Sequence, residues 1–167
     1  MKIAVLSDIH DQVWNLRSAL EKLQEADALV CCGDLCSPFT LDLLAEGFQK
    51  PIYAVEGNNE GDRRRLSLVA GKFPHVRLCG EFFQGELGGR KVAINHYPEI
   101  ALPLAQSGLY AVVFYGHNHR PAIETAGKTL AVNPGTLLGY DPIQKIDVPP
   151  SYAMYDTLDN TAEISTV

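Results

Sequence analysis

Short apolar segments alternate with amphipathic segments over the first 70 residues of the chain. Three segments are rich in aliphatic residues and stop at polar residues, which is typical of buried strands; they are Lys2–Leu6, Ala28–Cys32 and Pro51–Val55. The segments between and after them carry apolar residues at helical spacing, and the predicted helices cover 12–25, Pro38 to about Gly47, and Arg63–Ala70. This β-α-β-α-β-α order predicts parallel strands with helices packed on them.

The second half of the chain has short apolar segments separated by tight-turn signals. Gly88-Gly89 and the segment 126–128 each separate two such segments, as in β-hairpins. The predicted strands are Glu81–Leu87, Lys91–Asn95, Tyr110–Tyr115, Ala122–Thr125, Thr129–Val132, Tyr152–Asp156 and Ala162–Ser165, with a loop over 142–150. We therefore expect antiparallel pairing in this half, and an α/β fold of two packed sheets with helices outside.

The length of 167 residues is close to the roughly 150 residues of one typical domain, so we expect a single domain over residues 1–167. The formal net charge of −6 disfavours an extended nucleic-acid-binding surface. No apolar run approaches the roughly 18 residues of a membrane span, and a strand-like segment begins after one Lys. We expect neither a signal peptide nor a membrane anchor, and a cytoplasmic location. The four cysteines lack CxxC spacing, which favours reduced thiols.

Side chains that can bind metals follow five of the predicted strands. They are Asp8, His10, Asp34, Asn58, His96, His117 and His119. The carboxyl ends of parallel strands form the ligand crevice of α/β sheets, so one shared site is expected. An extended backbone would place Asp8 and His10 on one side of the chain, and likewise His117 and His119, so that each pair offers two ligands to a common centre. A glycine precedes three of these residues and permits a tight turn.

Seven donors are too many for one tetrahedral zinc ion, but they suit two ions that share a carboxylate and a water. Imidazole, carboxylate and amide donors without thiolate favour divalent metals, of which we expect manganese first, with iron, zinc or nickel as alternatives. Two ions about 3.5–4 Å apart acidify the shared water and clamp the attacking and leaving oxygens of an in-line displacement at phosphorus. With two aspartates and one hydroxide the centre would carry about +1, which attracts a phosphate ester.

Five blocks in chain order resemble the signature of the calcineurin-like metallophosphoesterase superfamily. They are Asp8-Ile9-His10, Gly33-Asp34, Gly57-Asn58-Asn59-Glu60, His96 and Gly116-His117-Asn118-His119. The short chain and the Gly-His-x-His-x-Pro form ending at Pro121 resemble its compact bacterial and archaeal phosphodiesterase branch. The resemblance implies a β-sandwich of two mixed sheets flanked by helices, with metals at its rim. It also implies ligand sets: Asp8, His10 and His119 for the first metal, Asn58, His96 and His117 for the second, and Asp34 as the bridge.

Two residues depart from the family pattern. The third block of the family usually carries a histidine that stabilises or protonates the leaving group, and Asn59 stands there; an amide cannot supply a proton. We therefore place Asp34, Asn58 and Asn59 in the catalytic centre of a dinuclear phosphodiesterase that attacks small diesters through a metal-bridging hydroxide. Alkyl monoesters should be poorer substrates. Tyr97 follows His96 where the family usually has glycine, which would alter access beside the second metal.

Two alternative functions stay open at this point. The superfamily includes a retromer subunit that keeps the fold for protein binding with a degenerate metal site, so a catalytically weak metal-binding scaffold is one alternative. A phosphomonoesterase is the other, although Asn59 and the short chain disfavour it. Small members of the resembled branch also look oligomeric, so a homo-oligomer is an expected assembly.

Several other polar residues have simpler structural interpretations. We expect His75 to lie in a surface loop, Asp11 to cap the first helix, and Glu60 to orient its neighbours or begin a helix. Cys36 is not needed as a ligand, because the set of oxygen and imidazole donors is complete. The residues whose contact with substrate stays open are Arg63, Arg64, Arg65 and Tyr97.

Overall fold

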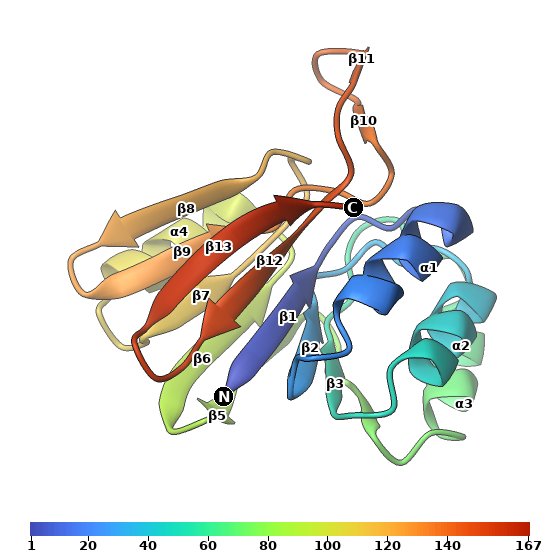
Figure 1. Cartoon of the computed structure of the whole chain (residues 1–167), viewed down its shortest axis with the longest axis horizontal. Coiled ribbons are helices and arrows are strands. Elements are labelled where there is room, and N and C mark those ends of the chain that lie inside the picture. The colour runs from blue at the N-terminus through green and yellow to red at the C-terminus, as the bar shows by residue number, and fades with distance from the viewer.

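The structure is a computed structural model that describes residues 1–167, with four helices and thirteen strands (Figure 1). The helices are α1 (Val13–Lys22), α2 (Pro38–Gly47), α3 (Arg63–Ala70) and α4 (Pro98–Gln106). The strands are β1 (Lys2–Leu6), β2 (Ala28–Cys31), β3 (Ile52–Ala54), β4 (Val76–Leu78), β5 (Phe82–Leu87), β6 (Arg90–Asn95), β7 (Val112–Phe114), β8 (Ala122–Ala126), β9 (Thr129–Asn133), β10 (Tyr140–Asp141), β11 (Ile146–Asp147), β12 (Ser151–Asp156) and β13 (Thr161–Thr166). None of the helices has the length and apolar character that crossing a membrane requires.

The first sheet has six strands in the order β13-β12-β1-β2-β3-β4. Strands β1 to β4 run parallel, with Val5 opposite Val30 and Cys31 opposite Ala54. β12 pairs antiparallel with β1 and forms a hairpin with β13. The alternation of strands and helices predicted for the first 70 residues is therefore confirmed, and β4 adds a parallel strand that the sequence pattern did not reveal.

The second sheet has five strands in the order β5-β6-β7-β9-β8. The hairpins β5–β6 and β8–β9 are antiparallel, as predicted. The pairs β6–β7 and β7–β9 are parallel, so the expectation of antiparallel pairing in this half was wrong for these two pairs. Parallel neighbours need a crossover connection, and the unpredicted helix α4 supplies it between β6 and β7.

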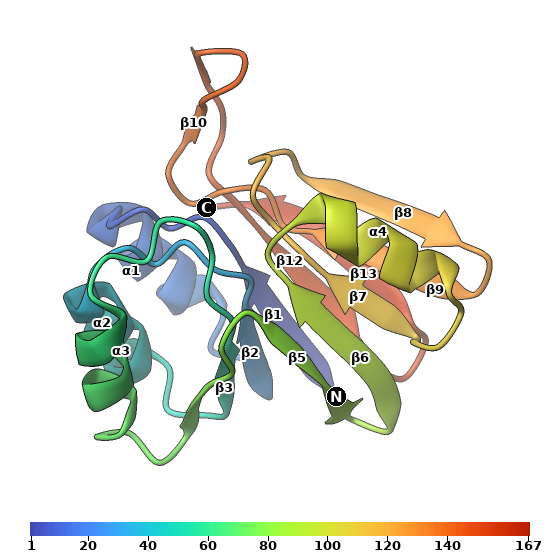
Figure 2. The same ribbon diagram turned by 180° about the vertical axis from the view of Figure 1, so that it is seen from behind.

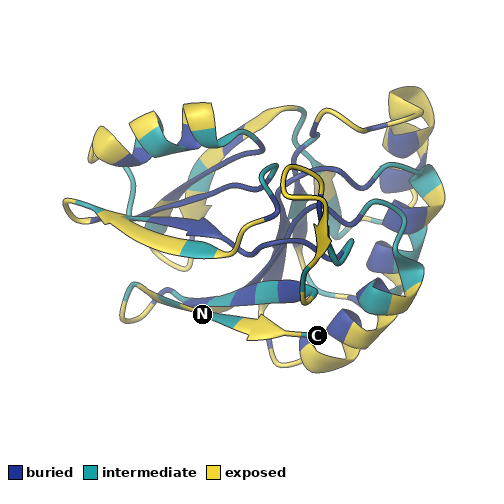
Figure 3. Ribbon diagram, turned by 90° about the horizontal axis from the view of Figure 1, so that it is seen from above, coloured by how far each residue is buried: buried dark blue, intermediate teal, exposed yellow.

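The two sheets and the helices form four layers (Figures 1 and 2). Helices α1, α2 and α3 cover one face of the first sheet, the second sheet covers its other face, and α4 packs on the outer face of the second sheet. In β1, Ala4 and Leu6 belong to the core under the helices, whereas Ile3 and Val5 belong to the core between the sheets. A strand that is covered on both faces has a continuous apolar sequence. Figure 3 shows the same division, with buried residues inside and exposed residues on the outer helix faces. The predicted sandwich of two mixed sheets flanked by helices is confirmed.

Two local features differ from the sequence predictions. The segment after β9 leaves the body as a narrow hairpin of β10 and β11, where only a loop was expected (Figure 1). Asp11 does not cap α1, which begins after Gln12 without a side-chain cap. Its carboxylate instead accepts hydrogen bonds from the backbone N of Ser37, at 2.9 Å, and from the hydroxyls of Ser37 and Thr40. Asp11 therefore anchors Ser37, the N-cap residue of α2, because the loop after β1 lies beside the start of that helix.

Candidate metal centre

The carboxyl ends of β1, β2, β3, β6 and β7 carry all seven side chains that were predicted as ligands. They are Asp8 and His10 after β1, Asp34 after β2, Asn58 after β3, His96 after β6, and His117 and His119 after β7. Contacts among these side chains join them into one site, as the strand-end argument predicted.

Five of the seven residues have a left-handed backbone instead of the extended backbone that the spacing suggested. The angle φ is +52° at Asp8, +46° at His10, +58° at Asp34, +72° at His117 and +59° at His119. Residues other than glycine rarely adopt this conformation, and those that do concentrate at functional sites. Asp8 and His10 still meet at one centre, but His117 and His119 turn toward different parts of the site.

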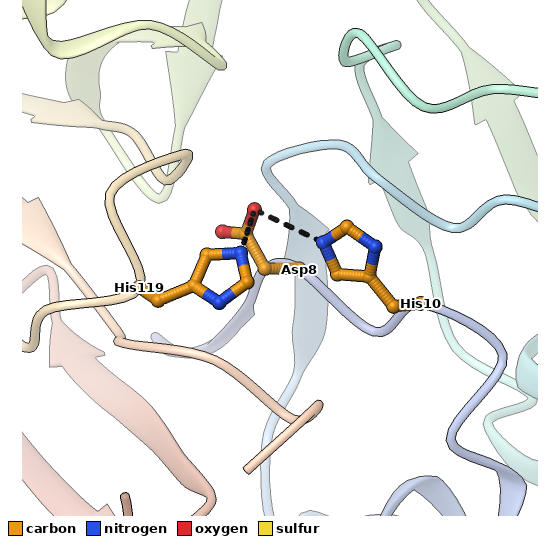
Figure 4. Close-up of side chains that lie close together, drawn as sticks. All are labelled: Asp8, His10 and His119. Carbon is orange, nitrogen blue, oxygen red and sulfur yellow. Dashed lines mark ion pairs between the residues drawn. The ribbon is translucent and has the colours of Figure 1, made fainter. Parts of the chain in front are cut away.

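Asp8, His10 and His119 form the first part of the site (Figure 4). The Asp8 Oδ1 atom lies 3.3 Å from His119 Nε2 and 3.8 Å from His10 Nε2. The other carboxylate oxygen, Oδ2, accepts hydrogen bonds from Ser7 Oγ at 2.6 Å and from the backbone N of His117 at 2.9 Å. Asp8 Oδ1 and His10 Nε2 are buried and have no hydrogen-bond partner. Buried polar atoms are nearly always paired, so the convergence of these two atoms fits a bound cation.

Asp34 lies between the first part of the site and the second. Its Oδ2 atom is 3.4 Å from His10 Nε2 and 3.5 Å from His96 Nε2. Asn59 holds the same carboxylate, because its backbone N donates to Oδ1 and its Nδ2 donates to Oδ2, both at 2.8 Å. One oxygen of Asp34 therefore faces both groups of histidines, while Asn59 fixes the orientation of the carboxylate.

Asn58, His96 and His117 form the second part of the site. Asn58 Oδ1 lies 3.0 Å from both His96 Nε2 and His117 Nδ1, and these two nitrogens are 3.2 Å apart. Ligands held about 2.0–2.1 Å from one ion lie roughly 2.8–3.4 Å from one another, the short end for octahedral and the long end for tetrahedral geometry, so this spacing fits a shared ion. The ring of Tyr97 packs edge-on against both imidazoles, with centroid distances of 5.0 Å to His96 and 5.1 Å to His117.

Backbone carbonyls orient two of the histidines. His96 Nδ1 donates to the carbonyl of Cys32 at 2.7 Å, and His119 Nδ1 donates to the carbonyl of Tyr140 at 2.6 Å. Because Nδ1 carries the proton in each ring, Nε2 is the atom that turns toward the site, which is the usual arrangement of a metal-binding histidine.

The acidic and imidazole groups of the site stabilise each other's charged forms. Burial lowers the pKa of His96 and His119, but the neighbouring carboxylates of Asp34 and Asp8 outweigh it and raise both pKa values above the usual range. Burial likewise raises the pKa of the two carboxyl groups. The neighbouring imidazoles and, at Asp34, the hydrogen bonds from Asn59 outweigh it, so both pKa values lie below the usual range. The carboxylates are therefore ionised at neutral pH and available to a cation.

The glycines that precede three of the ligands allow close approach more than they allow turning. Only Gly33 has a positive φ, of +102°. A Cβ atom at Gly57 would lie 2.2 Å from Asp34 Oδ1, and one at Gly116 would lie 1.8 Å from Ser7 Oγ. Any larger residue at Gly57 or Gly116 would therefore displace a group that holds or forms the site.

Two other residues singled out in the sequence, Arg63 and His75, have structural contacts. Arg63 pairs with Glu56 at 3.3 Å and Glu81 at 3.2 Å, so its guanidinium is already engaged. His75 Nε2 lies 3.0 Å from the carbonyl of Ala45 and is not one of the residues gathered at the strand ends.

Two residues near the site hold ligands indirectly. Cys36 Sγ lies 3.5 Å from His10 Nδ1, so the thiol contacts a predicted ligand. Thr136 Oγ1 donates to the carbonyl of Asp8 at 2.8 Å. Ser7, which orients Asp8, was missed in the sequence, where its only signal was a hydroxyl directly before a buried acid.

A two-sheet sandwich whose strand ends gather aspartates, histidines and an asparagine is the architecture of a metal-dependent phosphoesterase. Residues 1–160 match the family described as the calcineurin-like phosphoesterase superfamily domain, and the chain belongs to this family. The chain is 34% identical over 144 residues to a phosphodiesterase of Methanocaldococcus jannaschii, covering 84% of this chain and 86% of that protein. It is 27% identical over 174 residues to phosphodiesterase YfcE of Escherichia coli, covering 93% of this chain and 88% of that protein.

Solved structures give the same fold. The structure of an archaeal phosphodiesterase superposes with a TM-score of 0.89 at 29% identity, covering 100% of both chains. Vacuolar Protein Sorting 29 from Cryptosporidium parvum shares the fold alone, with a TM-score of 0.69 at 19% identity, covering 99% of this chain and 96% of that chain. The protein is therefore a hydrolase that acts on phosphoric esters and depends on divalent metal ions.

Proposed function

We propose that the protein is a phosphodiesterase that uses two divalent metal ions. Asp8, His10 and His119 hold the first ion, and Asn58, His96 and His117 hold the second, with Asp34 shared between them. The observation that carries this proposal is the position of Asp34 Oδ2, 3.4 Å from His10 Nε2 in the first group and 3.5 Å from His96 Nε2 in the second. A single carboxylate oxygen that faces both groups is suited to bridge two ions.

The donor chemistry supports divalent ions at these positions. Asp8 Oδ1 and His10 Nε2 lack hydrogen-bond partners, and Asn58 Oδ1 lies against nitrogens of two rings. These contacts are favourable only when protons or cations lie between the atoms. Imidazole, carboxylate and amide donors suit manganese, our first choice, and also iron, zinc or nickel. When bound, such ions supply a hydroxide nucleophile at neutral pH and neutralise charge in an in-line displacement at phosphorus.

The protein's own residues favour diesters. Asn59 stands where the family pattern has a histidine, and its amide donates to Asp34 at 2.8 Å. An amide cannot protonate a departing alkoxide, so a poor leaving group receives no help from this side chain. A phosphodiester or an activated aryl ester therefore suits the site better than an alkyl monoester does.

Tyr97 lines the second group of ligands, because its ring packs against His96 and His117. The Tyr97 side chain occupies space that would be open if this position carried the glycine of the family pattern. We therefore propose that substrates are small phosphodiesters. A single-domain organisation, a homo-oligomeric assembly and a cytoplasmic location stay predictions from the sequence.

The test is hydrolysis of bis(p-nitrophenyl) phosphate by protein loaded with manganese. We expect turnover that is abolished by a chelator, restored by manganese, and lowered more than about 100-fold by Asp34→Asn, because the amide cannot bridge two cations with a full negative charge. Asp42→Asn is the matched control, since Asp42 is a partly exposed residue of α2 whose carboxylate pairs only with Lys72, at 3.8 Å. Turnover that survives both the chelator and Asp34→Asn would overturn the proposal.

A metal-binding scaffold is the second candidate, because the fold also occurs in Vacuolar Protein Sorting 29. Likeness at 19% identity concerns the fold alone. Competent donors at all seven ligand positions favour the enzyme. Tight binding of two ions without turnover of any phosphoric ester would favour the scaffold.

A further inference from the structure

Glu60 is a buried acid beside the candidate metal centre, and its carboxylate forms hydrogen bonds with backbone N–H groups and with no side chain of the candidate ligands. It accepts four backbone N–H hydrogen bonds. Its Oε1 atom receives the N–H groups of Asp34 at 2.7 Å, Gly57 at 3.0 Å and Leu35 at 3.3 Å, and its Oε2 atom receives that of Cys36 at 3.0 Å. The residue is 9% exposed, so these bonds replace water almost completely.

The four donors belong to two loops that each carry a proposed ligand. Asp34 lies in the loop after β2, and Asn58 lies in the loop after β3, directly beyond Gly57. The loops touch each other through their backbones, because a Cβ atom at Gly33 would lie 2.8 Å from the backbone N of Gly57. Glu60 therefore joins two loops whose N–H groups would otherwise converge without an acceptor.

The backbone of the first loop is shaped to bind an anion. The angle φ is +102° at Gly33, +58° at Asp34 and +71° at Cys36. Leu35, between Asp34 and Cys36, has no positive φ. A turn in which left-handed residues alternate with others directs successive N–H groups toward one side, which creates a concave anion site of the kind that holds phosphates in other proteins. Here the carboxylate of Glu60 fills that place, and it compensates the unfavourable backbone conformation of Asp34 and Cys36.

We propose that Glu60 is a positioning residue that sets the distance between Asp34 and Asn58, and through it the second metal site. This inference rests on the proposed two-metal function. The carboxylate is required because it only accepts hydrogen bonds, whereas a glutamine amide would turn a donating NH₂ group toward at least one N–H group. Loss of one loop contact would let Asn58 move away from Asp34. Asp8, His10 and His119, which follow β1 and β7 and hold the first ion, would stay in place.

The test is calorimetric titration of chelator-treated protein with Mn²⁺. The variants His10→Ala and His117→Ala assign the two binding steps to the first and second ion. For Glu60→Gln we expect affinity for the second ion to fall about 10–100-fold, as when other residues that orient metal ligands are changed, and affinity for the first ion to change less than about threefold. Glu56→Gln is the matched control, because Glu56 lies on the same segment and pairs with Arg63 instead of the loops. It is expected to leave both steps unchanged within about twofold.

A second variant keeps the test decisive if Glu60→Gln does not fold. Glu60→Asp keeps the charge but withdraws it by one methylene, and it should lower affinity for the second ion by a smaller factor. Amide hydrogen exchange on the same proteins provides a readout without metal: Asp34, Cys36 and Gly57 should exchange faster in Glu60→Gln than in the wild type. Equal affinity for the second ion in the wild type and in both Glu60 variants would overturn the inference while the proposed function stands. A wild-type protein that binds fewer than two ions would contradict the proposed function and this inference together.

Discussion

Replacing Gly116 with alanine should displace the Asp8 carboxylate, because Gly116 packs directly against the residues that hold it. A Cβ atom at this position would lie 1.8 Å from Ser7 Oγ, 2.6 Å from Asp8 Oδ2 and 2.9 Å from Ser7 Cβ. Ser7 and Asp8 are both 0% exposed, so neither side chain can move aside into solvent. The methyl group must therefore break the 2.6 Å hydrogen bond between Ser7 Oγ and Asp8 Oδ2.

Two costs contribute to the expected loss of stability. Forcing an extra methyl group into a packed interior costs about 1–3 kcal/mol. Losing a hydrogen bond to a charged group costs about 1.5–3 kcal/mol more. The expected total of about 2.5–6 kcal/mol is a large share of the roughly 5–15 kcal/mol by which domains are stable. Backbone strain adds nothing, because φ at Gly116 is not positive.

Urea unfolding of chelator-treated protein, followed by circular dichroism, measures this loss. Gly71→Ala is the control, because its Cβ atom would meet nothing closer than the carbonyl oxygen of Ser67 at 3.5 Å. We expect the control to stay within about 1 kcal/mol of the wild type. Adding Ser7→Ala to Gly116→Ala removes the nearest atom and should recover part of the loss. A Gly116→Ala protein within about 1 kcal/mol of the wild type would refute the steric argument.

Three further predictions concern other groups. His96 and His119 have raised pKa values, so the stability that they contribute is complete below their ordinary pKa of about 6.5 and is lost as pH rises through the raised values. The Tm of chelator-treated protein should therefore fall as pH rises above about 6.5, and a rise in Tm would contradict the assigned partners. Asn59→His introduces a proton donor and should raise the rate on p-nitrophenyl phosphate relative to that on bis(p-nitrophenyl) phosphate, whereas an unchanged ratio argues against this role. Asp11→Ala removes the acceptor that anchors the start of α2 and should lower the free energy of unfolding by about 1–3 kcal/mol without changing metal stoichiometry. A loss below about 0.5 kcal/mol would contradict the anchoring role.

The fold was predictable wherever burial on both faces makes a strand uniformly apolar, as in Lys2–Leu6. Helix α4 was missed because its buried positions, Ala101 and Ala105, contrast weakly with their neighbours, and because Pro103 interrupts the helical pattern. The parallel pairing of β6 with β7 depends on that helix, so missing it also gave the wrong strand direction. These features are decided by packing against the second sheet, which local patterns do not report.

The members of the candidate site were predictable, but its geometry was not. Ordered blocks of aspartate, histidine and asparagine predict the candidate ligands because metal-dependent chemistry needs those donors. The left-handed backbone at Asp8 and Asp34 is invisible in the residue pattern, since such conformations persist only when surrounding contacts hold them. The close packing that requires a glycine at positions 57 and 116 likewise depends on segments that approach from distant parts of the chain.

The most direct test of the central claim is the number of divalent ions that the protein needs for turnover. Native mass spectrometry of manganese-loaded protein, with hydrolysis of bis(p-nitrophenyl) phosphate measured on the same samples, counts ions and activity together. We predict that activity appears only with the species that carries two ions, and that Asp34→Asn binds fewer than two ions and loses activity. Full activity in a species that carries one ion, or none, would contradict the claim.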